Sequence, residues 1–235
     1  MPAGRWLMAQ RWNNLAFLHW PVATDEVRAR VPSVLELDLH ANTAWLSITP
    51  FYLSDMRAHG TPAVPWLSEF PELNVRTYVT LDGKPGVFFF SLDAGSVLAV
   101  NGARMLFDLP YQYATMSAHT EPNGAIAYQS SRGDGTGTVA EFDAVYAPTG
   151  PVQLAPPGSL DHWLSERYCL YAVDPRAHVY RMEIHHWQWP LQPMRIEVRR
   201  NTMATAAGLT LPPIPPRTSF ARSLDVVIWN RERVR

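Results

Sequence analysis

The segment from residue 74 to residue 94 is predicted to form two β-strands joined by a tight turn, and it constrains the fold more than any other part of the chain. The strands are expected over NVRTYVTL and GVFFFSLDA, and residues 82–85 between them are rich in turn formers. The second strand carries four consecutive apolar residues, which is typical of a strand covered on both faces. The hairpin is therefore predicted to lie inside a sheet rather than at its edge.

Other short β-patterned runs recur along the chain with turn signals between them, and no linker is long enough to separate domains. This pattern predicts one mainly antiparallel β domain over residues 1–235, of the α+β class, with peripheral helices. VLELDLH and TAWLSITPFYL are expected to pair as a hairpin around Ala41 and Asn42.

Four helical segments are expected. The first covers residues 24–31 with Thr24 as its N-cap, the second residues 95–106, and the third starts at Ser159 in SLDHWLSERY. The fourth is expected in RIEVRRNTMATAAG, which ends in a glycine.

The composition limits the class of partner. The 20 basic and 21 acidic residues nearly cancel, so no positive surface for nucleic acid or an anionic membrane is expected. No run reaches the roughly 18 apolar residues needed to span a bilayer. The single cysteine, Cys169, can form no internal disulfide, which fits a cytoplasmic location. The expected partner is a small molecule, and assembly into an oligomer stays open.

An extended ELNVRTYV segment carries its largest polar side chains on one face. With a period of two, this face holds Glu72, Asn74, Arg76 and Tyr78. On an open sheet such a face would be solvated, whereas in a closed barrel it would line a cavity. Glu72 and Arg76 could form a structural ion pair, or Arg76 could bind a substrate carboxylate. The residues alone leave these alternatives open.

Other reactive side chains form no recognisable site. His185 and His186 are adjacent, so they point to opposite faces of a strand, and no metal is expected. The glycine-rich GDGTGT at residues 133–138 lacks the helix and lysine of a phosphate loop and is expected to be a hairpin turn, so no cofactor is expected. The single lysine, Lys84, lies in a turn signal, which normally places the side chain in solvent.

Several motifs resemble those of the YqjF-like family of the acetoacetate decarboxylase-like superfamily. They are FLHWPV, NVRTYV, FFFSLDA, AR followed by DLPY, LSERYCLY and HHWQWPLQP, and the resemblance runs from about residue 15 to about residue 229. It implies a largely antiparallel, cone-shaped β-barrel with flanking helices. This expectation agrees with the strand-rich pattern.

The resemblance also implies a difference in chemistry. The decarboxylase pattern has an arginine in a helix, then an aromatic residue, a proline and two consecutive lysines. Arg104 and Pro110 match this pattern, but Tyr111 and Gln112 stand where the lysines should be. A phenol and an amide cannot form the imine on which that enzyme depends, so acetoacetate decarboxylation is not expected.

Two functions remain open. The first is a binding protein that holds a small organic acid or carbonyl compound. Its expected ligand-binding residues are Glu72, Arg76, Tyr78, Arg104, Tyr111 and Gln112, with Arg76 or Arg104 as the anion clamp. A buried arginine without a partner is costly, so one of these two arginines is expected to contact Glu72, Asp93 or an anion.

The second is a lysine-independent lyase or hydrolase. Here Glu72 would be the general base, and Tyr111 or His19 the general acid. A raised pKa of Glu72 in a concave pocket would favour catalysis, whereas a closed Glu72–Arg76 ion pair would favour a structural role.

Overall fold

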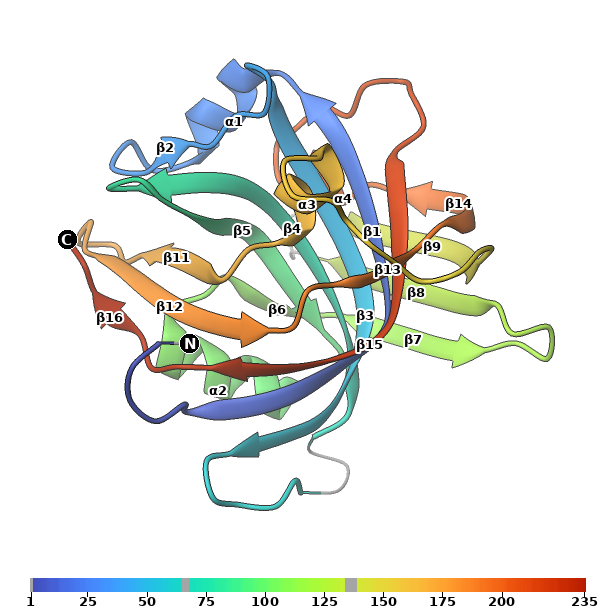
Figure 1. Cartoon of the computed structure of the whole chain (residues 1–235), viewed down its shortest axis with the longest axis horizontal. Coiled ribbons are helices and arrows are strands. Elements are labelled where there is room, and N and C mark those ends of the chain that lie inside the picture. Colours follow the sequence, from blue (N-terminus) through green and yellow to red (C-terminus); the bar gives the residue numbers. More distant parts are fainter. Residues whose placement is uncertain (1, 65–67, 134–138) are drawn as a thin grey trace.

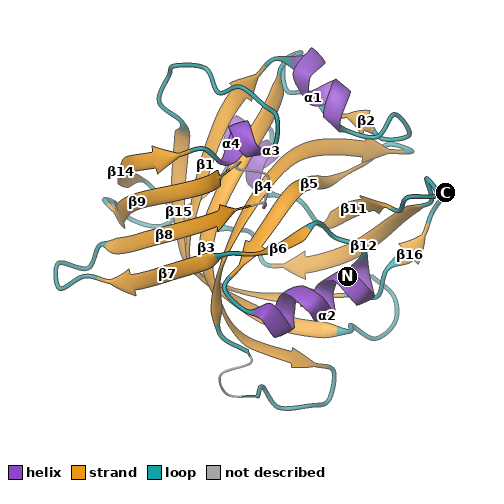
Figure 2. Ribbon diagram, turned by 180° about the vertical axis from the view of Figure 1, so that it is seen from behind, coloured by secondary structure: helices purple, strands orange, loops and turns teal. Residues whose placement is uncertain are grey.

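Strands dominate the computed structural model, which describes residues 2–64, 68–133 and 139–235. Most strands belong to one strongly curled sheet, and a smaller sheet packs against its outside (Figures 1 and 2). The prediction of a mainly β fold with peripheral helices is confirmed. No helix in the described ranges is both long and apolar enough to cross a membrane.

Within the described chain, seven strands of the large sheet pair in a closed circuit. In spatial order they are β15 (Arg217–Ile228), β1 (Met8–Val22), β3 (Ala44–Ala58), β4 (Phe70–Leu81), β5 (Lys84–Ala94), β11 (Cys169–Val173) and β12 (Val179–His186). Neighbours are antiparallel except β5 and β11, and β12 pairs back to β15. The sheet therefore encloses an interior, as the predicted barrel requires.

Shorter strands extend this sheet and build the second one. The extensions are β2 (Glu36–Leu37) on β4, β6 (Tyr111–Tyr113) on β5, β13 (Pro190–Gln192) on β15, β10 (Gln153–Leu154) on β13, and β16 (Glu232–Arg233) on β12. The second sheet consists of β7 (Thr115–Thr120), β8 (Ile126–Gly133), β9 (Val139–Pro148) and β14 (Met194–Asn201), all antiparallel.

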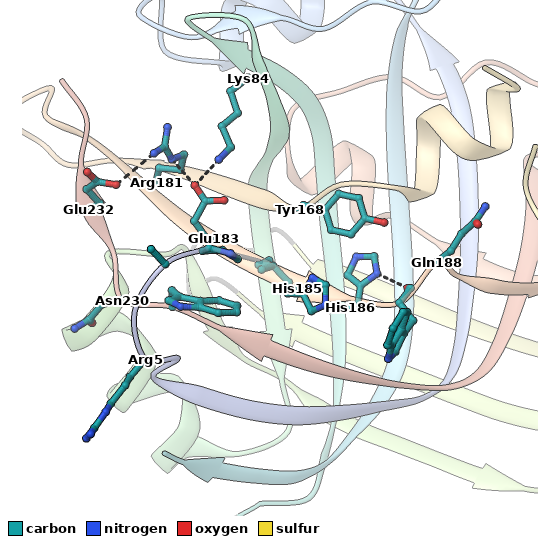
Figure 3. Close-up of a pocket in the computed structure, with 15 residues that line it drawn as sticks. Arg5, Lys84, Tyr168, Arg181, Glu183, His185, His186, Gln188, Asn230 and Glu232 are labelled. Atoms are coloured by element: carbon teal, nitrogen blue, oxygen red, sulfur yellow. Dashed lines mark hydrogen bonds and ion pairs between the residues drawn. The ribbon is translucent and has the colours of Figure 1, made fainter. Parts of the chain in front are cut away.

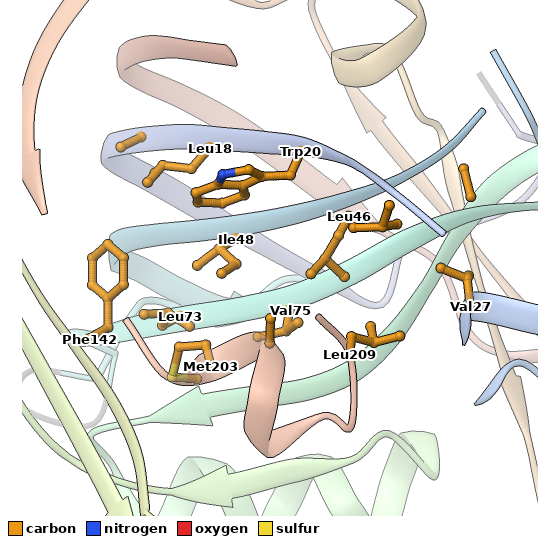
Figure 4. Close-up of a cluster of buried hydrophobic side chains, with 14 of the residues drawn as sticks. Leu18, Trp20, Val27, Leu46, Ile48, Leu73, Val75, Phe142, Met203 and Leu209 are labelled. Atoms are coloured by element: carbon orange, nitrogen blue, oxygen red, sulfur yellow. The ribbon is translucent and has the colours of Figure 1, made fainter. Parts of the chain in front are cut away.

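Strand β4 lies between two buried environments. Leu73 and Val75 face a core between the two sheets, which they share with Phe142 of β9 (Figure 4). Glu72 and Arg76, on the opposite face, line a cavity inside the curled sheet. The hypothesis of a solvated polar face is therefore wrong, and the alternation predicted from ELNVRTYV is confirmed.

The helices are α1 (Thr24–Arg30), α2 (Val97–Phe107), α3 (Leu160–Ser165) and α4 (Met203–Ala206). Ser159 caps α3 by accepting a hydrogen bond from the His162 backbone N–H, as predicted. Thr24 is not the N-cap of α1, because Ala23 takes that position without a side-chain bond. Helix α2 is capped by Ser96.

Two sequence predictions about strands are corrected by the structure. RIEVRRN forms β14 rather than a helix, because its Ile196 and Val198 alternate with charged residues and the segment pairs with β9. The predicted hairpin of VLELDLH with β3 is reduced to one antiparallel bridge, His40 with Thr43, around Ala41 and Asn42. It extends no further, since both edges of β3 are occupied by β1 and β4. The segment instead contributes β2, which pairs with β4.

The turn predicted at residues 133–138 joins two strands that do pair. Gly133 of β8 lies opposite Val139 of β9 in an antiparallel ladder. Residues 134–138 themselves lie outside the described residues.

Gly86 allows β5 and β11 to approach closely. A Cβ atom at this position would lie 2.7 Å from Cε2 of Tyr171 and 2.9 Å from the backbone oxygen of Cys169. Gly86→Ala is therefore expected to lower the free energy of unfolding by roughly 1–3 kcal/mol, because the backbone cannot move without breaking the β5–β11 pairing. Urea denaturation of the variant and the parent measures this difference.

Gly102→Ala in α2 is the matched control, since a Cβ there meets no atom within 4 Å. This variant is expected to be as stable as the parent or slightly more stable. Equal losses of unfolding free energy in Gly86→Ala and Gly102→Ala would contradict the steric explanation.

Candidate functional site

A cavity of about 70 Å³ lies inside the curled sheet. Most of its wall is aliphatic or aromatic, and a few polar side chains interrupt it. The polar lining residues are Gln10, Thr49, Glu72, Asn74, Arg76, Tyr111, Ser165, Arg167 and His186. A largely apolar cavity with a few converging polar groups is typical of a small-molecule site. We call it the central cavity.

Glu72 is the carboxylate of the central cavity and is only 4% exposed. The Tyr128 hydroxyl from the second sheet donates to the Glu72 backbone oxygen at 2.7 Å, which fixes β4 at this point. Burial raises the pKa of Glu72 to about 7, partly offset by hydrogen bonds from Asn74 and Tyr111, and the charge of Asp93 raises it further. Near neutral pH this group can therefore either give or accept a proton.

Tyr111 places a phenol beside this carboxyl group. Its hydroxyl lies 3.4 and 3.5 Å from the two carboxylate oxygens of Glu72. These are long hydrogen bonds, and such bonds often shorten when a ligand binds. Burial, together with the Glu72 charge, raises the pKa of Tyr111 well above its ordinary value, so the phenol keeps its proton.

Arg76 is 8% exposed and carries its charge into the central cavity. Its Nε and Nη2 atoms find no hydrogen-bond partner among the described residues, and its guanidinium carbon lies 5.6 Å from the centre of the Phe17 ring. The expected contact with a carboxylate is not observed in the part of the chain that the structure describes. Asp93 is paired instead with Arg132 of β8 at 2.9 Å, and Glu72 bonds to Tyr111. Burial lowers the pKa of Arg76.

Arg167 is a second buried arginine of the same cavity, and no pattern in the sequence marked it as a site residue. Its Nε donates to the Trp163 backbone oxygen at 2.8 Å, and its Nη1 pairs with Asp38. The guanidinium carbon lies 4.4 Å from the centre of the Trp163 ring and 4.9 Å from that of Tyr78. Its Nη2 finds no partner in the described part of the chain.

The indole N–H of Trp189 also lacks a partner among the residues that the structure describes, and Trp189 lines the cavity too. The ring packs edge-on against Phe17, with their centres 4.9 Å apart. Because Phe17 also lies against Arg76, these donors belong to one end of the cavity. The central cavity thus combines a donor-rich end with an apolar wall and the Glu72–Tyr111 pair.

Three predicted ligand-binding residues do not line the central cavity, namely Arg104, Gln112 and Tyr78. The exposed Arg104 donates from Nε to the Tyr111 backbone oxygen at 2.6 Å and from Nη2 to Oε1 of Gln112 at 3.0 Å. Arg104 and Gln112 are therefore bonded to each other, and the two bonds of Arg104 attach α2 to β6. The structure therefore gives Arg104 a positioning role for Tyr111 rather than a place in the cavity.

Tyr78 and His19 are buried behind the cavity wall. The Tyr78 hydroxyl lies 3.2 Å from Nδ1 of His19, and neither residue lines the cavity. Burial, followed by the charges of Arg76 and Arg217, holds the pKa of His19 well below its ordinary value. His19 is therefore a neutral imidazole, and Tyr78 acts as a platform for Arg167.

A second chamber of about 330 Å³ adjoins the central cavity beneath α2. Its wall is mostly apolar and includes Leu53, Met56, Phe70, Leu98, Ala99 and Phe107. Both spaces share Met8, Gln10, Glu72, Phe107 and Tyr111 as wall residues. We call this space the α2 chamber.

A wider groove of about 1010 Å³ lies outside the sheet along β12 (Figure 3). Four of its charged groups are paired with one another, since Glu183 contacts Lys84 at 2.5 Å and Arg181 at 2.8 Å, and Glu232 contacts Arg181 at 3.3 Å. The single lysine of the chain is thus in this groove and not in the central cavity. Over the described ranges, no three His, Cys, Asp or Glu side chains come together as a potential metal site.

The fold is similar to those of solved enzymes. The acetoacetate decarboxylase of Legionella pneumophila (strain Philadelphia 1) has a TM-score of 0.65 at 15% identity, with 100% of this chain and 92% of that chain covered. The enduracididine biosynthesis enzyme MppR complexed with pyruvate gives 0.67 at 11% identity, with 100% and 92% covered. An acetoacetate decarboxylase-like enzyme from Sphingomonas wittichii RW1 gives 0.64 at 11%, with 98% and 94% covered. At these identities the likeness concerns the fold alone.

The sequence has a much nearer relative. It is 48% identical over 230 residues to the uncharacterized protein YqjF of Bacillus subtilis (strain 168), and the match covers 97% of this chain and 93% of that protein. Residues 9–225 match the DUF2071 model, which describes an uncharacterized conserved protein. The resemblance seen in the motifs is therefore confirmed: the chain belongs to the DUF2071 family and has an acetoacetate decarboxylase-like fold.

Proposed function

We propose that the protein binds a small organic acid in the central cavity, with the ligand carboxylate at Arg76. The observation that carries this proposal is the buried Arg76 guanidinium, whose Nε and Nη2 have no partner among the described residues. A buried charge without a partner is costly, and a carboxylate accepts two parallel N–H bonds from a guanidinium. An anionic ligand would supply the missing partner.

The surroundings favour an anion over a neutral ligand. Arg167 Nη2 and the Trp189 indole are further donors without partners in the described chain. The charge of Arg167 is balanced by Asp38, whereas no carboxylate within residues 2–64, 68–133 and 139–235 is paired with Arg76. Because the pKa of Glu72 is about 7, its charge is only partly present at neutral pH. One negative charge on the ligand would therefore complement the cavity.

The comparisons support a small acid as the ligand. The structural neighbour MppR was solved with pyruvate, which is a short carboxylic acid with a carbonyl group. In this chain no imine with a carbonyl compound is expected in the cavity, because Tyr111 lines it and Lys84 is paired with Glu183 in the outer groove. The proposed binding is therefore non-covalent.

A second candidate function is acid–base catalysis without lysine, as a lyase or hydrolase would perform it. The observation in its favour is Glu72, whose pKa of about 7 is suited to proton transfer at neutral pH. Tyr111 would donate a hydrogen bond to a ligand oxygen while Glu72 takes a proton. The neutral, buried His19 lies behind Tyr78 and has no part in this proposal.

Arg76→Met tests the binding proposal. The variant removes a buried charge and leaves a side chain of similar length, so it is expected to be at least as stable as the parent. The affinity for propionate and pyruvate, measured by isothermal titration calorimetry, is expected to fall about 10- to 100-fold, as the loss of charge-assisted hydrogen bonds implies.

Arg195→Met is the matched control, because it removes an exposed guanidinium of β14 that does not line the cavity. Its affinity for both acids is expected to equal that of the parent. Equal binding by the Arg76 variant and the parent would contradict the proposal.

Glu72→Gln tests the ionisation of the cavity carboxyl. Unfolded glutamate titrates near ~4.3 and folded Glu72 at about 7, so between these pH values the folded state keeps a proton that the unfolded state has lost. Glu72 therefore lowers the free energy of unfolding as the pH rises through this window, by roughly 4 kcal/mol in total. The variant is expected to be more stable than the parent by about that amount at pH 8 and equally stable near pH 4.

Chemical denaturation at the two pH values measures the difference. The exposed Glu69→Gln serves as the control and is expected to match the parent at both. If Glu72→Gln exceeds the parent in free energy of unfolding by the same amount at pH 4 and pH 8, then folding does not raise the pKa of Glu72.

Acetoacetate tests the exclusion of imine chemistry. No release of carbon dioxide is expected from the parent, nor from Tyr111→Lys, because a single buried lysine lacks the cationic neighbour that Gln112 replaces. After the parent is treated with acetoacetate and borohydride, the peptides that contain the cavity residues are expected to keep their masses. An adduct on a peptide of the cavity would overturn the non-covalent account.

A further inference from the structure

The α2 chamber is larger than the central cavity and chemically different from it. About 330 Å³ lie beneath α2, against about 70 Å³ inside the sheet. Among the described side chains, the wall of the chamber is mostly aliphatic and aromatic, with Glu72, Tyr111 and Gln10 as its polar members. A ligand as small as pyruvate would fill the polar end of the site and leave this apolar wall uncovered.

The two spaces meet at defined residues. Glu72, Tyr111, Gln10, Met8 and Phe107 line both of them. A molecule whose carboxylate lies at Arg76 can therefore continue past the Glu72–Tyr111 pair into the chamber. Along this path a ligand would meet first the hydrogen-bond donors near Arg76, then the Glu72–Tyr111 pair, and finally the apolar wall of the α2 chamber.

The outer end of the chamber carries apolar side chains that face solvent. Leu98, in the first turn of α2, lines the chamber and is 69% exposed, and its neighbour Val97 is 51% exposed. Large exposed apolar residues next to a cavity mark a surface that an apolar ligand can cover. The chamber is thus open to an apolar chain from the side of α2.

We propose that the ligand class is carboxylic acids with an unbranched apolar tail of several carbons, with the carboxylate at Arg76 and the tail in the α2 chamber. This inference rests on the proposed binding of an acid in the central cavity and adds the nature of the rest of the ligand. The tail gains affinity by leaving water, in proportion to the apolar area that the chamber buries.

A series of straight-chain acids from acetate to octanoate tests the proposal by calorimetry on the full chain. Each added CH₂ is expected to tighten binding about fourfold, until the tail fills the chamber. Affinity that stays flat along the series would overturn the inference while leaving the proposed function intact. If no acid of the series binds, both proposals fail.

Gly102→Leu tests where the tail lies. Gly102 lines the chamber, a Cβ there meets no atom within 4 Å, and leucine is a better helix former than glycine. The variant is expected to bind octanoate at least about tenfold more weakly than the parent, since leucine fills space worth several CH₂ groups. Its affinity for propionate is expected to be unchanged, which also shows that the central cavity is folded.

Asn101→Leu is the matched control, because it adds the same side chain to an exposed position of α2 that does not line the chamber. Its affinity for octanoate is expected to equal that of the parent. If Gly102→Leu binds octanoate as well as the parent does, the tail does not occupy the chamber and the inference is overturned.

Discussion

The pairing of β12 with β15 closes the large sheet, and the chemistry of the interior depends on that closure. It places β4 between two buried environments, so the face with Glu72 and Arg76 turns inward while the Leu73 face packs against the second sheet. On an open sheet, water would solvate the same side chains and their ionisation would be ordinary. Enclosure removes that water, which explains the raised pKa of Glu72 and the cost of the Arg76 charge.

The second sheet holds this arrangement in register. Tyr128 of β8 donates to the backbone oxygen of Glu72, and Arg132 of the same strand neutralises Asp93. Because Arg132 occupies Asp93 and Tyr111 is the hydrogen-bond neighbour of Glu72, neither carboxylate is paired with Arg76. Arg76 is thus paired with neither carboxylate because both of them already have other partners. The proposed ligand, which brings one negative charge, would complete this set of pairs.

The sequence predicted the part of the site that lies on one strand, because period two is a local property. It placed Glu72 and Arg76 on one face and, through the family resemblance, Tyr111 beside them. It could not predict Arg167, which reaches the cavity through a pairing with Asp38 across 129 positions of the chain. Local propensity also failed for β14, where pairing with β9 decides the conformation, and for β2, whose expected partner had no free edge. These errors share one cause, since strand pairing is set by the whole sheet.

The central claim is that Arg76 receives the carboxylate of an organic acid. A crystal structure with a brominated short acid such as 3-bromopropionate tests it directly, because anomalous scattering locates the bromine independently of the model. We predict a carboxylate oxygen ~2.7–2.9 Å from Nε or Nη2 of Arg76, with the bromine directed toward Glu72 and Tyr111. A ligand found instead in the outer groove beside Lys84 and Arg181, or in the cavity away from Arg76, would contradict it.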